Sequence, residues 1–328
     1  MRRPALRVRL YSRRVCSLLA CSLSARSLLA FCVLACSPGM TPAMAAVTVT
    51  DDGGHVLSLP RPAERIVSLS PHATELLFAA GAGGKLAGVS EFSDYPPQAR
   101  DIPSIGSSMQ LDIERIVALK PDLIIAWQSG NNARQVARLR KLGYPVFDSE
   151  PRRLDDIART LETFGTLAGT SQGVTAARAF RERQQSLRQR YAGKAPVRVF
   201  YQIWPSPLMT LNDQHIVSDA LALCGAVNVF GKLPQLAPGV SRESVVAAMP
   251  EAIFASDERN ESWDRWRALP QLPAVRLDNL YRIDGAVMNR AGPRMLDATE
   301  TLCRHIDEAR ARLAASQSAT VKPKKEKP

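Results

Sequence analysis

A gapless internal repeat constrains the fold of this chain more than any other feature. Residues 111–127 read LDIERIVALKPDLIIAW, and residues 240–256 read VSRESVVAAMPEAIFAS. In each copy a carboxylate, Glu114 or Glu243, enters a short amphipathic helix, and a proline then separates that helix from a short apolar strand. Apolar strands of this kind are typical of buried parallel sheets. Two copies about 130 residues apart therefore predict two similar α/β lobes that face one another.

The segments around the repeat extend it into two complete lobes. A polar hairpin is expected at 47–59, followed by strands at 65–70, 86–90 and 145–147 and helices at 71–81, 132–142 and 154–167. Ser70 is expected to cap the helix that Pro71 begins. This alternation predicts a parallel sheet with right-handed crossovers. In the second lobe we expect a strand at 197–203, a helix at 218–224 and a last helix at 302–313.

A proline-free helical pattern at about 173–191 separates the lobes. The predicted fold is thus α/β, with two Rossmann-like lobes joined by one long rigid helix and a ligand cleft between them. The predicted segments are a signal peptide at 1–45, a first lobe at 46–170, a connecting helix at 171–195, a second lobe at 196–315 and a disordered basic tail at 316–328.

The net charge of +12 is concentrated at the two ends of the chain. Residues 1–45 hold seven arginines and no acidic residue, and residues 322–328 hold four lysines and one glutamate. A nucleic-acid-binding protein would need its basic residues clustered on the fold itself. We therefore expect no nucleic-acid partner, and we interpret the basic ends as a leader and a solvated tail.

The first 45 residues have the pattern of an export signal. A basic start is followed by an apolar run near 27–36 and by an Ala43-x-Ala45 cleavage pattern, with Ala46 as the first mature residue. The alternative is lipid attachment at Cys36. The apolar run is short for a membrane span, and no other segment resembles one. We expect an exported, periplasmic protein.

The predicted export makes the cysteine count informative, because only Cys224 and Cys303 lie beyond the predicted cleavage site. An even pair in an oxidising compartment is a candidate disulfide, and two buried free thiols are the alternative. The four histidines, His55, His72, His215 and His305, are too spread along the chain to predict a zinc site.

Ligands of open α/β sheets bind beyond the carboxyl ends of the strands. Here those ends carry the aromatic residues Phe92, Tyr95, Trp127 and Trp204. Their large planar rings suit a bulky ligand, although any one of them could instead pack between loops. Catalysis is poorly supported, because there is no GxSxG elbow: the one match, at 169–173, lies between two expected helices and does not follow a strand. His72, the best candidate base or metal ligand, is more simply polar lining. The glycines at 81–84 end a helix and do not follow a strand, so they predict no dinucleotide site.

Several segments resemble the periplasmic cobalamin-binding proteins of ABC importers. They are RIVSLSPHATELLFAAG, EFSDYPPQA, LDIERIVALKPDLIIAWQSGN, LALCGAVNVF and VSRESVVAAMPEAIF, and the similarity runs from about Glu64 to about Arg304. The resemblance implies two α/β lobes joined by a rigid helix, no enzymatic activity, and a corrinoid carried as transported ligand and not as cofactor.

The resemblance also implies roles for individual residues. Trp127 occupies the position of a family tryptophan that lines the corrin cleft, Phe92 that of a tyrosine, and Met209 that of a phenylalanine. Two further family tryptophans are replaced here by Ser108 and Ala237. Glu114 and Glu243 match glutamates that form salt bridges to permease arginines, and Cys224 and Cys303 match a family disulfide.

We therefore expect a monomeric, non-catalytic receptor that delivers cobalamin or a related corrinoid to an inner-membrane ABC permease. The residues expected to contact the ligand are Ser70, His72, Phe92, Tyr95, Trp127 and Met209. The alternative is a receptor of the same fold for haem or a ferric siderophore. Basic lining by Arg290 or Arg294 would favour an anionic siderophore, whereas neutral aromatic lining favours a corrinoid. A rigid connection predicts small lobe movements on binding.

Overall fold

Two four-stranded parallel sheets with the same strand order form the framework of the molecule. The computed structural model describes residues 46–256 and 261–321. The first sheet has the order β4-β3-β5-β6 and the second β10-β7-β11-β12. Their strands are β3 (Ile66–Ser68), β4 (Leu86–Val89), β5 (Leu123–Trp127), β6 (Val146–Ser149), β7 (Val197–Gln202), β10 (Ala226–Asn228), β11 (Ala252–Ala255) and β12 (Leu280–Arg282). In both sheets the strand that comes first along the chain lies second in the order, which confirms two similar α/β lobes.

The internal repeat forms equivalent elements in the two lobes. Helix α2 (Ile113–Ala118) leads into β5, and helix α7 (Arg242–Ala248) leads into β11, the third strand of its sheet in each case. Each helix is capped by the side chain of the residue before it, Asp112 or Ser241. Such caps satisfy backbone N–H groups that have no partner within the helix.

The correspondence extends to the hydrogen bonds that tie each helix–strand unit to its sheet. In the first lobe Arg65 donates a side-chain bond to the carbonyl of Leu119, and the Asp122 carboxylate accepts the backbone N–H of Arg65. In the second lobe Arg198 donates to the carbonyl of Ala248, and Glu251 accepts the backbone N–H of Arg198. The repeated sequence therefore encodes a repeated structural unit.

The other elements connect and cover these sheets. They are β1 (Val47–Thr50), β2 (Val56–Leu59), α1 (Pro71–Ala79), η1 (Gly83–Lys85), η2 (Pro97–Asp101), α3 (Ala133–Lys141), α4 (Leu154–Ala168), α5 (Gln172–Tyr191), β8 (Trp204–Pro205), β9 (Leu208–Met209), α6 (Ile216–Leu223), α8 (Glu261–Arg267), α9 (Pro273–Arg276), α10 (Gly285–Met288) and α11 (Met295–Val321). Strands β1 and β2 form the expected antiparallel hairpin.

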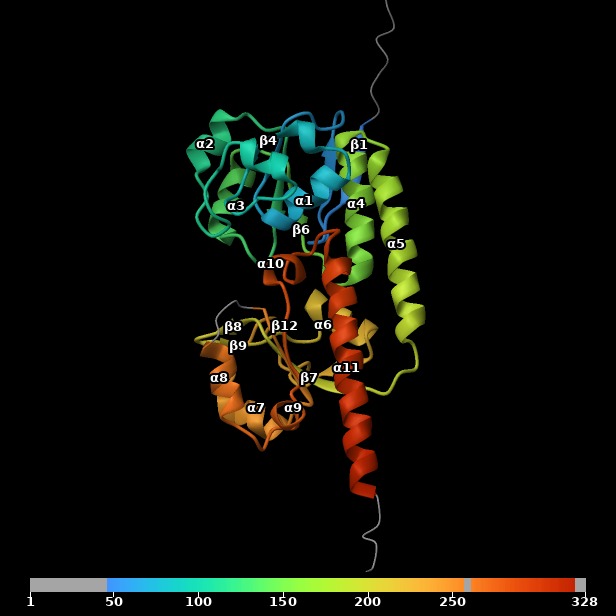
Figure 1. The fold of residues 1–328 in the computed structure, drawn as a ribbon. Coiled ribbons are helices and arrows are strands. Elements are labelled where there is room, and N and C mark those ends of the chain that lie inside the picture. Colours follow the sequence, from blue (N-terminus) through green and yellow to red (C-terminus); the bar gives the residue numbers. More distant parts are fainter. Residues whose placement is uncertain (1–45, 257–260, 322–328) are drawn as a thin grey trace, which may run out of the picture. The chain divides into compact units, whose positions relative to one another are not determined.

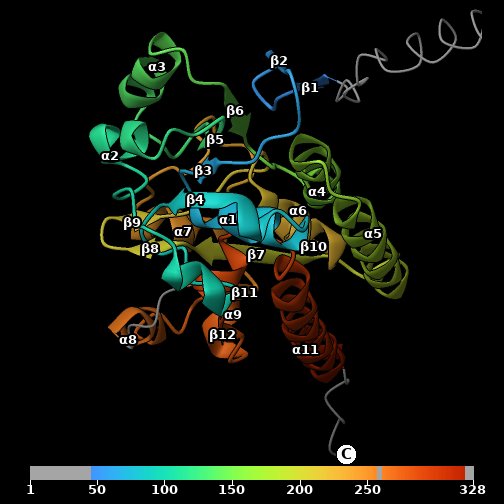
Figure 2. The same cartoon turned by 90° about the horizontal axis from the view of Figure 1, so that it is seen from above.

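Helix α5, which connects the lobes, packs against another helix. Figures 1 and 2 both show it running beside α4, and its buried face contains Gly173, Ala177 and Phe180. At the crossing, a side chain on Gly173 would lie only 2.3 Å from the carbonyl oxygen of Leu161, so glycine permits the close approach of the two helices. Whether this connection is rigid stays a prediction.

One hydrophobic cluster runs through both lobes. It includes Leu76 and Phe164 from the first lobe and Val199, Phe254 and Leu302 from the second. Separate clusters cover the outer face of each sheet, beneath α2 and α3 in one lobe and beneath α7 and α8 in the other. Because the shared cluster includes residues of α1, α4, α5, α6 and α11, separating the lobes would expose apolar surface to water.

The last helix corrects the predicted disordered tail. Helix α11 covers Met295–Val321, whereas we expected a helix only at 302–313 and disorder from 316. The segment 314–319, AASQSA, contains strong helix formers and no proline, so it can extend the last helix. The predicted signal peptide, Cys36 and residues 322–328 lie outside the described residues. Among the helices that are described, none is long and apolar enough to cross a membrane.

The predicted disulfide is confirmed, because Cys224 and Cys303 are bonded to each other. The bond ties the end of α6 to α11 across a sequence separation of 79 residues, and both cysteines are fully buried. It therefore anchors the last helix to the second lobe.

We expect reduction of this bond to lower the free energy of unfolding by about 4 kcal/mol, because a loop of this length strongly restricts the unfolded chain. Urea unfolding of the mature protein with and without a reductant measures the change. A Cys224→Ser/Cys303→Ser variant should match the reduced protein and show no response to reductant. Equal midpoints for the oxidised and reduced proteins would contradict this expectation.

Candidate functional site

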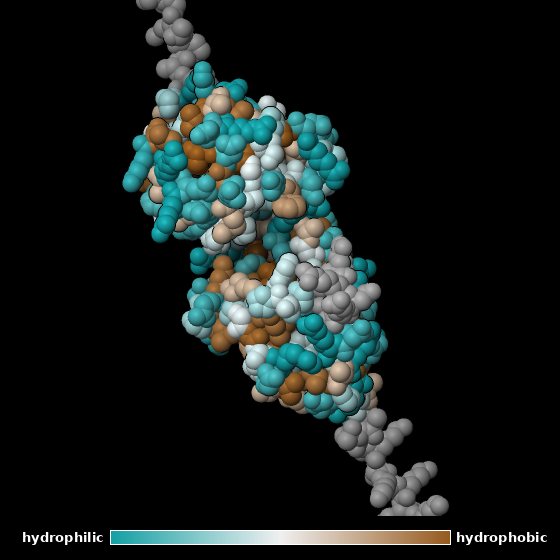
Figure 3. Space-filling view, turned by 90° about the vertical axis from the view of Figure 1, so that its left-hand side faces the viewer, coloured by the Kyte–Doolittle hydropathy of each residue, from teal (hydrophilic) through white to brown (hydrophobic). Residues whose placement is uncertain are grey.

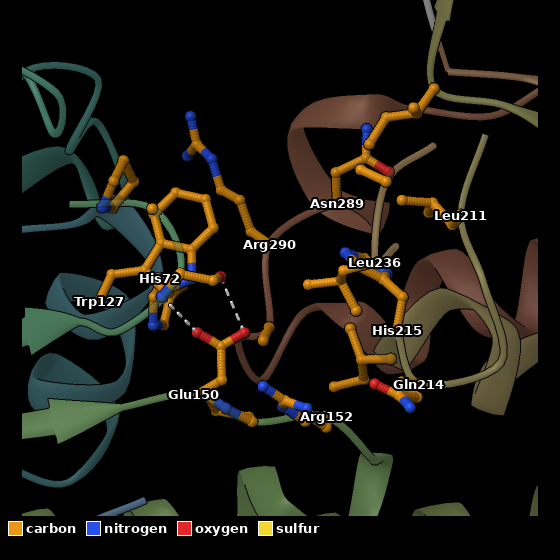
Figure 4. A pocket seen from close by; sticks show the side chains of 18 residues that line it. His72, Trp127, Glu150, Arg152, Leu211, Gln214, His215, Leu236, Asn289 and Arg290 are labelled. Atoms are coloured by element: carbon orange, nitrogen blue, oxygen red, sulfur yellow. Dashed lines mark hydrogen bonds between the residues drawn. The ribbon is translucent and has the colours of Figure 1, made fainter. Parts of the chain in front are cut away.

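A cavity of about 480 Å³ lies where the carboxyl ends of strands from both sheets meet. The first lobe contributes Pro71, His72, Trp127, Ser129, Gly130, Glu150, Pro151 and Arg152, and the second contributes Ile203, Leu211, Gln214, His215, Ile216, Leu236, Ala237, Asn289, Arg290 and Ala291. The surface is hollowed at this place (Figure 3), and Figure 4 shows the two walls facing each other. Its position agrees with the rule for open α/β sheets.

Trp127 forms much of the wall from the first lobe. It ends β5, and its ring lies edge-on to that of His72 at a centroid distance of 5.5 Å. Gly130 makes this position possible, since a side chain there would lie 2.0 Å from the indole. Asn131 fixes the backbone by accepting the N–H of Trp127 and donating to the carbonyls of Leu69 and Ser108. The indole is thus held in place before any ligand arrives.

Glu150, just after β6, provides a carboxylate to the same wall. Its oxygens accept bonds from the backbone and hydroxyl of Ser129 at 2.9 and 3.0 Å, drawn as dashed lines in Figure 4. Arg152 lies two residues further on and also lines the cavity. The wall therefore combines the indole of Trp127 with the carboxylate of Glu150 and the guanidinium of Arg152.

The wall from the second lobe is mainly uncharged. His215 precedes α6 and accepts the N–H of Val217 through Nδ1. Asn289 is held by the Tyr201 hydroxyl, which donates to its Oδ1 at 2.8 Å, and by Ser256 at 3.1 Å. Burial raises the pKa of Tyr201 well above its usual range, so this phenol stays protonated. The Asn289 side chain is thereby fixed beside the cavity.

Arg290 completes the cavity, but its charge is already paired. Its Nη1 lies 2.6 Å from Oδ1 of Asp94 and 3.4 Å from Oε1 of Glu75. Arg294 makes two bonds to Glu75, at 2.5 and 3.0 Å, and its guanidinium lies 3.8 Å from the centre of the Tyr95 ring. Because Glu75 and Asp94 belong to the first lobe, these pairs also bridge the two lobes.

Of the six residues expected to contact a ligand, the structure places His72 and Trp127 on the cavity wall. Phe92 is 76% exposed, with a left-handed φ of 64°, and lies on the loop after β4. Tyr95 lies under Arg294, and Met209 is half-buried in β9 without lining this cavity. A role for these three in ligand binding stays a prediction.

Ser70 needs correction in two respects. It is fully buried and does not line the cavity. It occupies the N-cap position of α1, yet its side chain makes no capping bond, and its hydroxyl oxygen has no hydrogen-bond partner among the described residues. Its carbonyl instead accepts bonds from Ser68 and Thr74. The turn is held by these two hydroxyls, which explains why a capping serine was a reasonable but incorrect expectation.

The remaining tryptophans are distributed unevenly. Trp204, 46% exposed, lines a second cavity of about 690 Å³ that shares Ile203 and Asn289 with the first. Trp263 and Trp266 are buried in the outer core of the second lobe. Only Trp204 among these three is therefore near the cleft.

Glu114 and Glu243 are both exposed, one in the first turn of each repeat helix. In the part of the chain that the structure describes, neither makes a salt bridge. The backbone N–H of Glu243 itself and the Ser241 hydroxyl lower the pKa of Glu243, so this carboxylate is ionised at neutral pH. Both side chains are available to a partner.

One group of possible metal ligands lies elsewhere. Asp51, His55 and Asp148 have ligand atoms within 4.8 Å of one another. Arg140 lies 2.6 Å from Asp148, and Asp51 accepts the backbone N–H groups of His55 and Asp148. Arg140 supplies the positive charge, so the group anchors the β1–β2 hairpin to the sheet.

Sequence reasoning missed four important residues: Glu75, Glu150, His215 and Asn289. Glu75 carried a usable signal, because it is the only acidic residue in the apolar helix 71–79. Such an acid, once buried, requires a partner. The other three lie in loops or at helix ends, where periodicity gives no information.

Burial holds both cavity histidines in their neutral form. Burial, with a smaller contribution from the charge of Arg290, lowers the pKa of His72 to about 4, and burial lowers that of His215 to about 4. In the unfolded chain both would titrate near 6.5. Between these values the unfolded state binds more protons, so acid favours unfolding.

We therefore expect the free energy of unfolding to be fully retained above pH 6.5 and to fall as the pH drops towards 4, by at most about 3 kcal/mol for each histidine. Urea unfolding across this range measures the slope. His72→Asn and His215→Asn should each flatten it. An unchanged slope in both cavity variants would exclude these histidines as its source.

Comparisons with known proteins agree with this geometry. A family model described as periplasmic binding protein matches residues 66–287. The vitamin B12-binding protein of Vibrio cholerae is 43% identical over 253 residues, which cover 76% of this chain and 92% of that protein.

Solved structures show the same relationship. The periplasmic vitamin B12-binding protein BtuF of Vibrio cholerae matches with a TM-score of 0.71 and 43% identity, over 76% of this chain and 98% of that one. The periplasmic haem-binding protein RhuT of Roseiflexus matches with a TM-score of 0.65 and 25% identity, over 75% of this chain and 99% of that one. The chain therefore belongs to the periplasmic binding protein family.

Proposed function

We propose that this protein is a periplasmic receptor that captures cobalamin or a related corrinoid in the cavity between its lobes. The observation that carries the proposal is the preformed wall of Trp127, placed where both sheets end, in a chain with 43% identity to a vitamin B12-binding protein. An aromatic face suits a flat macrocycle, and a fixed indole loses little entropy on binding.

The charge of the cavity supports a corrinoid over an anionic siderophore. Arg290 lines the cavity but is paired with Asp94 and Glu75, while Arg294 does not line it. The charge of Arg290 is therefore already paired with two carboxylates before a ligand enters. A ferric siderophore with several negative charges would find one of the two lining arginines, Arg290, already paired, which leaves Arg152 as the other cation of the wall.

A haem receptor is the second candidate, and the two cavity histidines favour it. Both imidazoles are neutral, the form in which histidine coordinates iron, and they lie on opposite walls in Figure 4. The similarity to RhuT agrees with this alternative. Parallel titrations with cyanocobalamin and with hemin separate the two candidates.

We expect the mature protein to bind one cyanocobalamin and Trp127→Ala to weaken this binding about tenfold, or roughly 1.4 kcal/mol, because it removes the aromatic wall. Gly130→Ala, which keeps the indole but displaces it, should also weaken binding. Calorimetric titration gives the affinities.

The control is Val174→Ala, at an exposed position of α5 outside the cavity, which should bind as the wild type does. Binding of hemin without binding of cyanocobalamin would replace the corrinoid by haem as cargo. Full affinity in both cavity variants would show that the ligand binds elsewhere.

Delivery to an inner-membrane ABC permease is the second part of the proposal. Glu114 and Glu243 support it, since they are exposed, occupy aligned positions of the repeat and lie one on each lobe. Two carboxylates on separate lobes could bind two permease subunits at once. Such two-point binding is tighter than either contact alone, because the second contact forms within an already bound complex.

We expect Glu114→Lys and Glu243→Lys each to reduce corrinoid-stimulated ATP hydrolysis by the reconstituted importer, and the double variant to reduce it further, because like charges would then face the permease. Cyanocobalamin affinity should not change. Glu182→Lys, at an exposed position of α5, is the matched control. Normal stimulation by the double variant would contradict docking through these residues.

A further inference from the structure

Glu75 lies beneath the cavity wall and has no direct access to the cavity. Its side chain is 2% exposed, and it projects from α1 in the first lobe. Its described partners are Arg290 and Arg294, more than 200 residues later in the chain. Gly292, between these arginines, approaches so closely that a side chain there would lie 3.1 Å from Oε2 of Glu75. The segment 290–294 therefore wraps around this carboxylate.

The four charged groups in this cluster cancel. Two carboxylates, Glu75 and Asp94, face two guanidinium groups, Arg290 and Arg294. Partial burial acts to raise the pKa of Asp94, but its hydrogen bond to Arg290 and the charge of that arginine lower it overall, so Asp94 is ionised. Of these four residues only Arg290 reaches the cavity. Arg290 therefore presents a cation to the cavity, and that cation is paired with Glu75 and Asp94 outside the cavity.

We propose that Glu75 is a specificity-determining residue, which neutralises Arg290 and thereby keeps the cleft selective for uncharged macrocycles over macrocycles that carry carboxylates. This inference rests on the proposed function, because it concerns the cargo of the same cavity. A buried charge without its partner exerts a strong field, since the protein interior screens it weakly. Loss of Glu75 leaves one net positive charge beside the cavity, where carboxylates such as the two propionates of haem would bind it.

The test compares the affinities of hemin and cyanocobalamin for the full mature protein. We expect Glu75→Gln to raise the ratio of hemin affinity to cyanocobalamin affinity about three- to tenfold at low ionic strength, with a smaller rise in high salt. Asp94→Asn should act in the same direction. Because Asp94 is half-exposed, this second variant tests the proposal even if Glu75→Gln does not fold.

Two further variants separate an effect of net charge on the affinity ratio from an effect of a disturbed structure. The double variant Glu75→Gln/Arg290→Gln is again neutral, so its affinity ratio should return towards that of the wild type. Glu162→Gln is the matched control, because Glu162 also makes a two-bond pair, with Arg181 at 2.5 and 2.7 Å, but lies on α4 away from the cavity. It should leave the ratio unchanged.

The outcomes distinguish this inference from the proposed function. A wild-type protein that does not bind cyanocobalamin contradicts the proposed function, while a rise in hemin affinity in the two single variants would still support the role of Glu75. An unchanged affinity ratio in both single variants, or a rise that the neutral double variant does not reverse, overturns the inference. Hemin binding that is undetectable in every variant also overturns it.

Discussion

The geometry of the cleft depends on one buried carboxylate shared between two halves of the chain. Glu75 is held by Arg290 and Arg294, so the helix that begins one wall is tied to the segment that completes the other. Removal of one partner would destabilise this arrangement, because an unpaired charge at this depth costs several kcal/mol. Asp94 and Tyr95 belong to the same cluster, which gives the loop after β4 a structural role in addition to any contact with ligand.

The lobes are joined by more than this cluster. The shared hydrophobic cluster passes through both, and α4, α5 and α11 lie along their junction. Arg183 and Arg190 of α5 pair with Asp297 or Glu300 of α11, and Leu154 of α4 donates its N–H to Asp219 of α6. This extensive junction is physically consistent with small lobe movements, since a wide opening would have to expose apolar surface and break several ion pairs together.

The candidate site was predictable only in part. The strand ends were located correctly because sheet topology follows from the order of the elements, and Trp127 and His72 followed from that location. Ser70 was misjudged as a capping residue because the neighbouring hydroxyls of Ser68 and Thr74 bond to its carbonyl and hold the turn. The surroundings of Tyr95 were not predictable, because Arg294, far away in the chain, covers its ring. The end of α11 was also misjudged, because a polar segment without proline can be either helix or coil until the preceding helix extends into it.

The sequence by itself determined the paired lobes, the repeated helix–strand units, the cysteine pair and the family resemblance. Each of these depends on local patterns or on residue identities, which a single chain displays directly. Only the tertiary structure decided that Glu75 lies beneath Arg290, that Gly130 makes room for the indole of Trp127, and that His72 and His215 are both neutral. These properties depend on burial and on contacts, several of them between residues far apart in the chain. Local patterns can mark a residue such as Glu75 as unusual, but they do not identify its partners, since the energy of a buried charge or ring is set by the neighbours that folding brings to it.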